Sequence, residues 1–173
     1  MTDIRFMIVA LLPRLRGFAL ALARSGDGAD DLVQATCEKA LRASDSWMPG
    51  TRLDSWMFRI MQNHWIDTKR MQKPQQPIEG EDGRLEIAGD DGPRITEARL
   101  TLGRVRGLID TLPEDQRAVL LLVCLEEMSY RDASEVLDIP VGTVMSRLSR
   151  ARRTLIEAME GESPLRSASG DKS

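Results

Sequence analysis

The chain has 173 residues, of which 42% are hydrophobic and 4% are aromatic, and its formal net charge is −3. This length allows one ordinary domain or two small ones, and the scarcity of aromatic residues beside many straight-chain residues favours helices. The longest apolar run, residues 118–125, is far shorter than the roughly 18 residues of a membrane span, and the chain shows no signal-peptide pattern. These features predict an all-α, cytoplasmic protein without membrane insertion.

An amphipathic helix is predicted near the start of the chain. Apolar residues recur at helical spacing over residues 15–23, and Pro13 suits the first turn of the helix that carries them. The glycine-containing segment 25–28 is predicted to end this helix. A second helix is expected over residues 29–43.

A third helix is predicted after the loop at residues 48–50. Thr51 and Asp54 have the spacing of a capping box, so the helix is expected to start there and to run to about Met71. The three helices would form a first domain over residues 1–73.

The middle of the chain differs sharply in composition from what precedes it. Residues 74–97 contain seven acidic and two basic residues, a net charge of −5, together with several prolines and glycines. Such a segment buries too little apolar surface to order itself, so it is predicted to be a flexible acidic linker. The small, polar residues 161–173 are predicted to be a disordered tail.

A second helical domain is predicted over residues 98–160. Its helices are expected over 95–111 and 114–127, followed by a short helix over 129–137 and a longer one over 140–159. The tight break between the last two helices is the spacing of a helix-turn-helix.

The longest helix of this second domain has two distinct faces. Apolar residues recur at helical spacing on the face expected to pack inward: Val144, Leu148, Ala151 and Leu155. The opposite face presents hydroxyls and arginines: Thr143, Ser146, Arg147, Arg150 and Arg153. Arginine donates two hydrogen bonds to guanine and also pairs with phosphate, so this face predicts a DNA recognition helix. The alternative is a solvated helix end, where cations favour the helix dipole.

The second domain resembles a known family at these residues. The strings 112–117, 128–132 and 139–152 closely resemble region 4 of extracytoplasmic-function (ECF) sigma factors, which reads the promoter −35 element. Ser134 departs from the Ala that is usual in this family, and Asp138 stands where Gly commonly makes the turn. Asp tolerates a left-handed backbone better than most residues, which makes the second departure acceptable.

The second predicted helix resembles another part of the same family. Residues 29–34 are similar to region 2.2, which docks on the clamp helices of the polymerase β′ subunit. Ala35 departs from the acidic residue that is usual at that point, so docking would depend more on Glu38. The resemblance implies four polymerase-binding residues: Asp31, Gln34, Glu38 and Leu41. It also implies that region 4 meets the β flap of core RNA polymerase.

The third predicted helix resembles regions 2.3 and 2.4, which melt and read the −10 element. The resemblance covers residues 53–67, and the preceding loop, 46–52, offers an aromatic ring and a cation that suit an unstacked base. The −10 residues implied are Trp47, Arg52, Asn63, Asp67 and Arg70. Trp56 and Phe58 are predicted to be core residues.

The sequence as a whole therefore predicts a sigma factor rather than an enzyme. It contains no metal-ligand cluster, glycine-rich phosphate loop or nucleophile elbow, so no cofactor, metal or catalytic residue is expected. Cys37 and Cys124 are predicted to be small buried hydrophobes. The resemblance implies a free monomer controlled by an anti-sigma factor. The alternative is a sigma-like decoy that titrates an anti-sigma factor, and such a protein is expected to lose the DNA-reading face.

Overall fold

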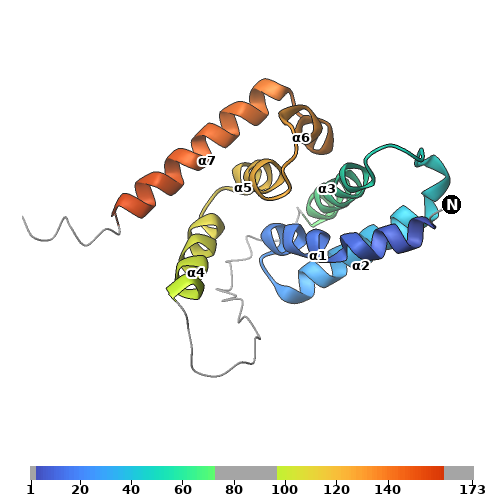
Figure 1. The fold of residues 1–173 in the computed structure, drawn as a ribbon, viewed down its shortest axis with the longest axis horizontal. Helices are drawn as coiled ribbons and strands as arrows, with labels where there is room; N and C mark the ends of the chain where they lie inside the picture. The colour runs from blue at the N-terminus through green and yellow to red at the C-terminus, as the bar shows by residue number, and fades with distance from the viewer. Residues whose placement is uncertain (1–2, 73–96, 162–173) are drawn as a thin grey trace, which may run out of the picture.

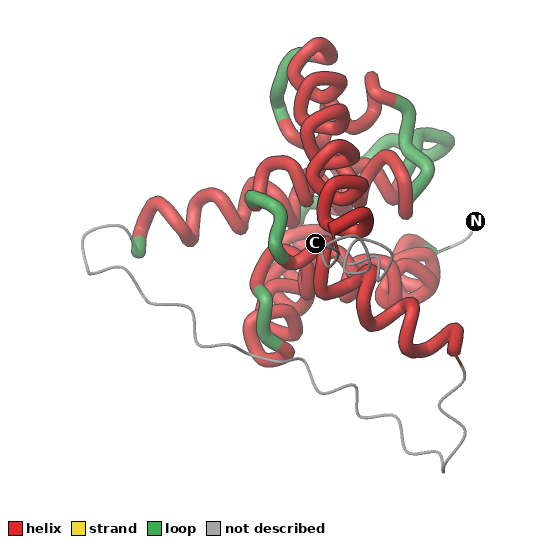
Figure 2. The backbone as a smooth tube through the Cα atoms, turned by 90° about the vertical axis from the view of Figure 1, so that its left-hand side faces the viewer, coloured by secondary structure: helices red, strands yellow, loops and turns green. Residues whose placement is uncertain are grey.

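The protein is helical throughout the residues that its structure, a computed structural model, describes: 3–72 and 97–161. No strand occurs in these two ranges, and the chain traced in Figure 2 consists of helices and short loops. The helices are α1 (Ile4–Ala23), α2 (Gly26–Arg42), α3 (Leu53–Met71), α4 (Glu97–Asp110), α5 (Glu114–Leu120), α6 (Tyr130–Leu137) and α7 (Val141–Gly161), with a short 3₁₀ turn η1 (Ser44–Ser46) and a π-helical segment η2 (Leu121–Leu125). The all-α prediction is confirmed. The predicted linker and tail lie outside the described residues except for Glu97 and Gly161, which belong to α4 and α7.

Helix α1 begins much earlier than the sequence pattern predicted. Its N-cap is Asp3, whose carboxylate accepts a hydrogen bond of 3.0 Å from the backbone N–H of Arg5, and Pro13 lies inside the helix. Proline has no N–H to donate to the carbonyl of Val9, but both residues lie on the exposed side of α1, where that carbonyl is not buried. The prediction that Pro13 starts the helix was wrong.

The boundaries of α2 and α3 also differ from the predicted ones. Helix α2 starts at Gly26, because the hydroxyl of Ser25 accepts the backbone N–H of Gly28 at 3.1 Å and caps the helix. The capping box predicted for α3 does not form. The hydroxyl of Thr51 donates to the carbonyl of Met48 instead, and the carboxylate of Asp54 binds two arginines.

The first three helices pack around an aromatic pair. The rings of Phe18 in α1 and Phe58 in α3 meet edge to face with their centroids 5.3 Å apart, and both side chains are almost fully buried. Thr36 on the inner face of α2 is buried as well, and its hydroxyl donates to the carbonyl of Leu32. Phe58 is therefore a core residue as predicted, whereas Trp56 is only half-buried.

The second half of the chain is built around α5, η2 and the inner face of α7. Val144, Leu148 and Ala151 are buried, as their spacing predicted. Arg117 in α5 is also buried, and its guanidinium donates to the carbonyls of Asp110 and Leu112 at the end of α4. This arginine thus satisfies backbone acceptors that the chain reversal between α4 and α5 leaves without helical partners.

The turn of the helix-turn-helix is formed by the two residues that depart from the family pattern. Asp138 has a left-handed backbone with φ of 52°, as its position in the turn predicted. The Ser134 hydroxyl donates to the carbonyl of Ile139 at 2.6 Å, and the Ile139 N–H donates back to the Ser134 carbonyl at 3.2 Å. The serine therefore closes the turn that the aspartate bends.

Replacing Asp138 with Gly is expected to raise the free energy of unfolding by about 0.5 kcal/mol. The left-handed conformation costs a non-glycine residue about 1 kcal/mol, and the greater backbone entropy of unfolded glycine offsets part of that gain. Ser134→Ala should act in the opposite direction by about 1 kcal/mol, because it removes the hydroxyl bond to Ile139. Urea unfolding of both variants measures these changes, and a loss of stability in Asp138→Gly would contradict this account.

The two halves of the molecule lie against each other. In Figure 1, α5 and α6 lie between α7 and the bundle of α1, α2 and α3, with α5 next to α1 and α6 next to α3. The buried apolar side chains of both halves form one continuous cluster. The expectation of two separate domains therefore omits a contact surface that joins them in this structure.

Two smaller features concern membrane insertion and the cysteines. Helix α1 has 20 residues and a mean hydropathy of 1.7, so it is long and apolar enough to cross a membrane. Core helices of soluble proteins and N-terminal signal sequences meet the same criteria, so these values do not identify a span. Cys37 is half-buried and Cys124 is exposed, so the prediction that both are buried was wrong for Cys124.

Candidate functional site

The proposed DNA-reading face of α7 is exposed over most of its length. Ser146, Arg150 and Arg153 are exposed, and Thr143 is half-buried at the start of the helix. Within the described ranges, neither Arg150 nor Arg153 forms an ion pair. The helix is anchored by its buried inner face, so these side chains are free to contact a ligand.

Arg147 differs from the other arginines of α7. Its side chain is only 28% exposed, and its Nε lies 3.2 Å from a carboxylate oxygen of Asp115 in α5. The sequence predicted that Arg147 lies on a free outward face, because the local pattern of α7 does not indicate that Asp115 of α5 lies beside it. In the structure this arginine turns toward α5 and is held by an acid.

Three of the five predicted −10 residues share an exposed stripe of α3. Asn63, Asp67 and Arg70 are all exposed, as their spacing along the helix predicted. His64, beside them, is half-buried. Burial, and then the charge of Lys39, lower the pKa of this histidine below its ordinary value, so the ring is neutral at pH 7.

The other two predicted −10 residues are not free. The ring of Trp47 is half-buried against the core, and its Nε1 atom is buried without a hydrogen-bond partner among the described residues. Arg52 pairs with Asp54 at 2.9 Å and with Asp132 of α6 at 2.7 Å. In this arrangement the structure does not present an open ring and a free cation in the loop before α3.

Asp54 is the centre of the charges around that loop. Burial opposes its ionisation, but hydrogen bonds from Arg52, from the backbone N–H of Ser55 and from Arg14 outweigh burial and hold its pKa below the ordinary value. The carboxylate is therefore ionised at neutral pH. It bridges the two arginines that face the second half of the chain.

The predicted polymerase-binding residues share one face of α2. Asp31, Gln34, Glu38 and Leu41 are all exposed, and the Gln34 side chain donates to the Glu38 carboxylate at 3.3 Å. Leu32, Thr36 and Ala40 occupy the opposite, buried face. Helix α2 therefore offers a continuous outer surface of two acids, an amide and an apolar side chain.

Sequence reasoning missed the polar residues that join the two halves. Trp65 and Lys69 of α3 both contact Glu114 of α5, and Arg14 of α1 contacts Glu126. The partners are separated by 45 to 112 residues along the chain. No local periodicity signals such pairs, so only the tertiary structure reveals them.

These features define the class of protein. A bundle of three helices is combined with a helix-turn-helix whose last helix presents exposed arginines, which is the architecture of a DNA-binding protein. Two family models match the chain: Sigma-70 region 2 over residues 7–75 and Sigma-70 region 4 over residues 102–155.

The sequence relatives agree with the family models. An ECF RNA polymerase sigma factor, EcfG of Rhodopseudomonas palustris, is 40% identical over 90% of this chain and 84% of its own length. The sigma factor CnrH of Cupriavidus metallidurans is 34% identical over 85% of this chain and 84% of its own. The chain belongs to the ECF family of RNA polymerase sigma factors.

Solved structures share the fold. The sigma factor RpoE of Bartonella quintana, in complex with the anti-sigma factor NepR, superposes with a TM-score of 0.74 at 30% identity and covers 94% of this chain and 100% of its own. The anti-anti-sigma factor PhyR of the same organism shares the fold alone, with a TM-score of 0.53 at 16% identity over 87% of this chain and 49% of its own. The fold is thus found both in a sigma factor and in a protein of another role.

Proposed function

We propose that this chain is a working sigma factor, which binds core RNA polymerase and directs transcription initiation by reading the −10 and −35 elements. The observation that carries the proposal is the outer face of α7, where Arg150 and Arg153 are exposed beside Ser146 and form no ion pair with any residue that the structure describes. A decoy that only titrates an anti-sigma factor has no use for a DNA-reading arginine face. Membership of the ECF family supports the same function.

Each binding surface is assigned to one helix or loop. The outer face of α2, with Asp31, Gln34, Glu38 and Leu41, binds the polymerase β′ clamp helices. The loop before α3 and the exposed stripe of that helix, with Trp47, Arg52, Asn63, Asp67 and Arg70, bind the −10 element. The outer face of α7, with Thr143, Ser146, Arg147, Arg150 and Arg153, binds the −35 element.

The domain limits follow from these assignments. Region 2 comprises residues 1–73 and region 4 comprises residues 98–160, with residues 74–97 as a linker and 161–173 as a tail. The protein works in the cytoplasm, as a monomer when free, and carries out no chemistry of its own. Region 4 also contacts the polymerase β flap.

The protein is also proposed to be held inactive by an anti-sigma factor. Two solved relatives support this proposal. The structure of RpoE of Bartonella quintana contains the anti-sigma factor NepR, and the structure of CnrH contains the cytosolic domain of CnrY. A partner that contacts both halves would keep α2 and α7 from their targets together.

Run-off transcription tests the proposed function. Core polymerase with this protein is expected to produce a transcript from a promoter near the gene for this chain, whereas core polymerase alone produces none. The variant Arg150→Ala/Arg153→Ala is the control, since it keeps the fold and removes the exposed arginines. If the protein binds core polymerase but yields no transcript, the decoy alternative is correct and the proposal is wrong.

A further inference from the structure

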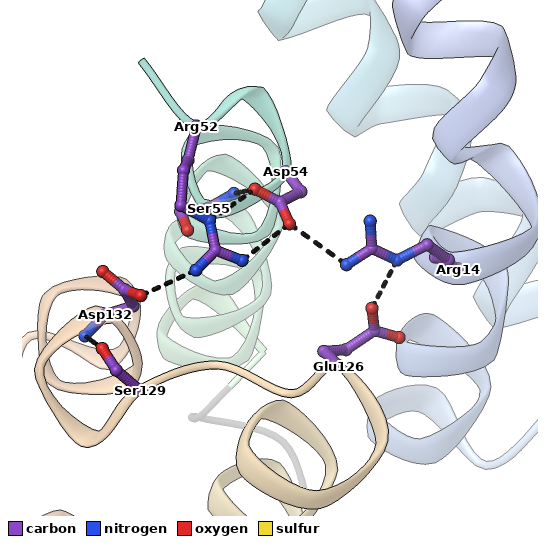
Figure 3. Close-up of polar contacts among 7 residues, drawn as sticks. All are labelled: Arg14, Arg52, Asp54, Ser55, Glu126, Ser129 and Asp132. Carbon is purple, nitrogen blue, oxygen red and sulfur yellow. Dashed lines mark hydrogen bonds and ion pairs between the residues drawn. The ribbon is translucent and has the colours of Figure 1, made fainter.

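The contact between the two halves is built from charges of opposite sign. Figure 3 shows the larger cluster, in which Arg14 of α1 binds Glu126 at 2.6 Å and Asp54 at 3.1 Å. Arg52 binds the other side of Asp54 and reaches Asp132 of α6 at 2.7 Å. Two arginines of region 2 thus hold two carboxylates of region 4, with Asp54 between them.

A second contact lies farther along α3. The indole N–H of Trp65 donates to the Glu114 carboxylate at 2.8 Å, and the ammonium of Lys69 pairs with the same carboxylate. That ammonium also lies 5.1 Å from the centre of the Trp65 ring. Glu114 starts α5, so α3 is joined to the start of α5 near one end and to α6 at the other.

The described ion pairs across this contact all have the same arrangement of bases and acids. Among the described residues, each ion pair between the halves has its base in region 2 and its acid in region 4. We call the six residues involved the interdomain latch: Arg14, Arg52, Lys69, Glu114, Glu126 and Asp132. Carboxylates of region 4 therefore pair with cations of region 2, and these cations would become exposed if the halves separated.

The contact surface includes proposed DNA-reading residues of both halves. Arg52, proposed for the −10 element, is paired with Asp132 across the contact. Arg147, proposed for the −35 element, lines a crevice of about 510 Å³ between α3 and the start of α7, together with Gln62, Lys69 and Asp115. The acid partner of Arg147, Asp115, lies in the same half, so closure covers Arg147 by placing α3 beside it rather than by pairing it with an acid.

The charges and the apolar contact have different effects on this arrangement. The continuous apolar cluster stabilises contact between the halves at any ionic strength. The ion pairs of Arg52 and Lys69 are about half exposed, so salt screens them. Glu126 is nearly buried, and separation of the halves returns its carboxylate to water.

We propose that the interdomain latch is an autoinhibitory contact, which holds the free sigma factor closed and keeps Arg52 paired with Asp132 until promoter DNA competes for it. This proposal rests on the proposed function, because it names what regulates the DNA-reading faces. Closure pairs Arg52 with an acid of region 4 and places Arg147 in the crevice beside α3, so the free protein binds DNA poorly. Opening exchanges carboxylates for phosphates on the basic face of region 2.

Small-angle X-ray scattering of the full chain tests closure. The radius of gyration of the wild-type protein is expected to rise between roughly 50 mM and 500 mM salt, because the Debye length falls over this range. The variant Glu114→Gln/Asp132→Asn should be extended already at low salt. Its closed-to-open ratio should fall by about 2- to 30-fold, the range for two exposed ion pairs.

A matched control removes the same charge elsewhere. The variant Glu135→Gln/Glu160→Gln also neutralises two exposed carboxylates of region 4, but neither residue contacts region 2. It should stay closed and keep the wild-type salt dependence. Lys69→Gln removes the region 2 partner of Glu114 and should also open the protein. This variant keeps the test decisive if circular dichroism shows that the double variant does not fold.

Binding of a labelled promoter duplex tests inhibition. The open variants are expected to bind the duplex more tightly than the control, by about the factor by which the closed-to-open ratio falls. If they match the control in radius of gyration and DNA affinity, or if they open without binding DNA more tightly, the latch is not autoinhibitory. If the wild-type chain binds polymerase but starts no transcript, the proposed function fails, while the scattering and DNA-binding data still decide on the latch.

Discussion

Replacing Asp31 with Lys and Gln34 with Ala together is expected to abolish holoenzyme formation. Both side chains are exposed on the outer face of α2, whereas Leu32, Thr36 and Ala40 on its inner face hold the core. The double variant removes an amide from the proposed clamp-helix contact and replaces a negative side chain there with a positive one. Loss of such a contact costs at least about 2 kcal/mol, which is roughly a 30-fold weaker Kd.

The measurement is a titration of labelled core polymerase with each variant. The helical circular dichroism signal should stay unchanged, because neither side chain contributes to the buried face of α2. Glu160→Lys is the control, since it reverses an exposed charge near the end of α7 and should leave assembly intact. Normal holoenzyme formation by the double variant would refute the assignment of α2.

Replacing Arg147 with Ala is expected to cost roughly 1 to 3 kcal/mol on the preferred −35 sequence and much less on a scrambled sequence. Arg147 lies one turn from Thr143, near enough to the start of α7 to reach base edges, and a base contact carries discrimination. Its pairing with Asp115 in the free protein places a carboxylate where guanine would bind. Asp115 belongs to the same half as Arg147, so opening of the latch would remove α3 from the crevice but leave this ion pair for DNA to displace.

Arg153→Ala should behave differently, because Arg153 lies farther along α7, where a contact with phosphate is expected. It should weaken binding to both sequences about equally and reduce the salt dependence by about one unit, since a phosphate contact releases a counterion whatever the sequence. Both variants would be measured as holoenzyme on both duplexes across a salt series. If Arg147→Ala and Arg150→Ala lower affinity without changing sequence preference, α7 is a backbone clamp rather than a reading helix.

Features that depend on residues close together in the chain were predictable. The spacing of Val144, Leu148 and Ala151 predicted the buried face of α7, and Asp138 was expected to adopt the left-handed turn that it adopts. The exposed residues of α2 were implied by the family resemblance instead. Helical periodicity and turn geometry act over a few residues, so the sequence records them directly.

Helix ends were predicted less well, because they depend on competition between partners. Thr51 and Asp54 have the spacing of a capping box, but Met48 and two arginines bind their side chains instead. Pro13 is a residue that suits a first helical turn, yet α1 extends on both sides of it because Asp3 caps an earlier start. Local propensity states which ends are possible, and the surrounding contacts select one.

The sequence by itself determined the all-helical fold, the family, and the faces of α2, α3 and α7 on which the proposed binding residues lie. Only the tertiary structure decided that Arg52 and Arg147 are engaged by acids and that region 4 closes on region 2. Arg14 and Glu126 are 112 residues apart, and the charges of such residues give no sign of which partner they will meet. The physical reason is that ion pairs between distant segments form only after packing has brought the helices together, whereas helical periodicity precedes packing.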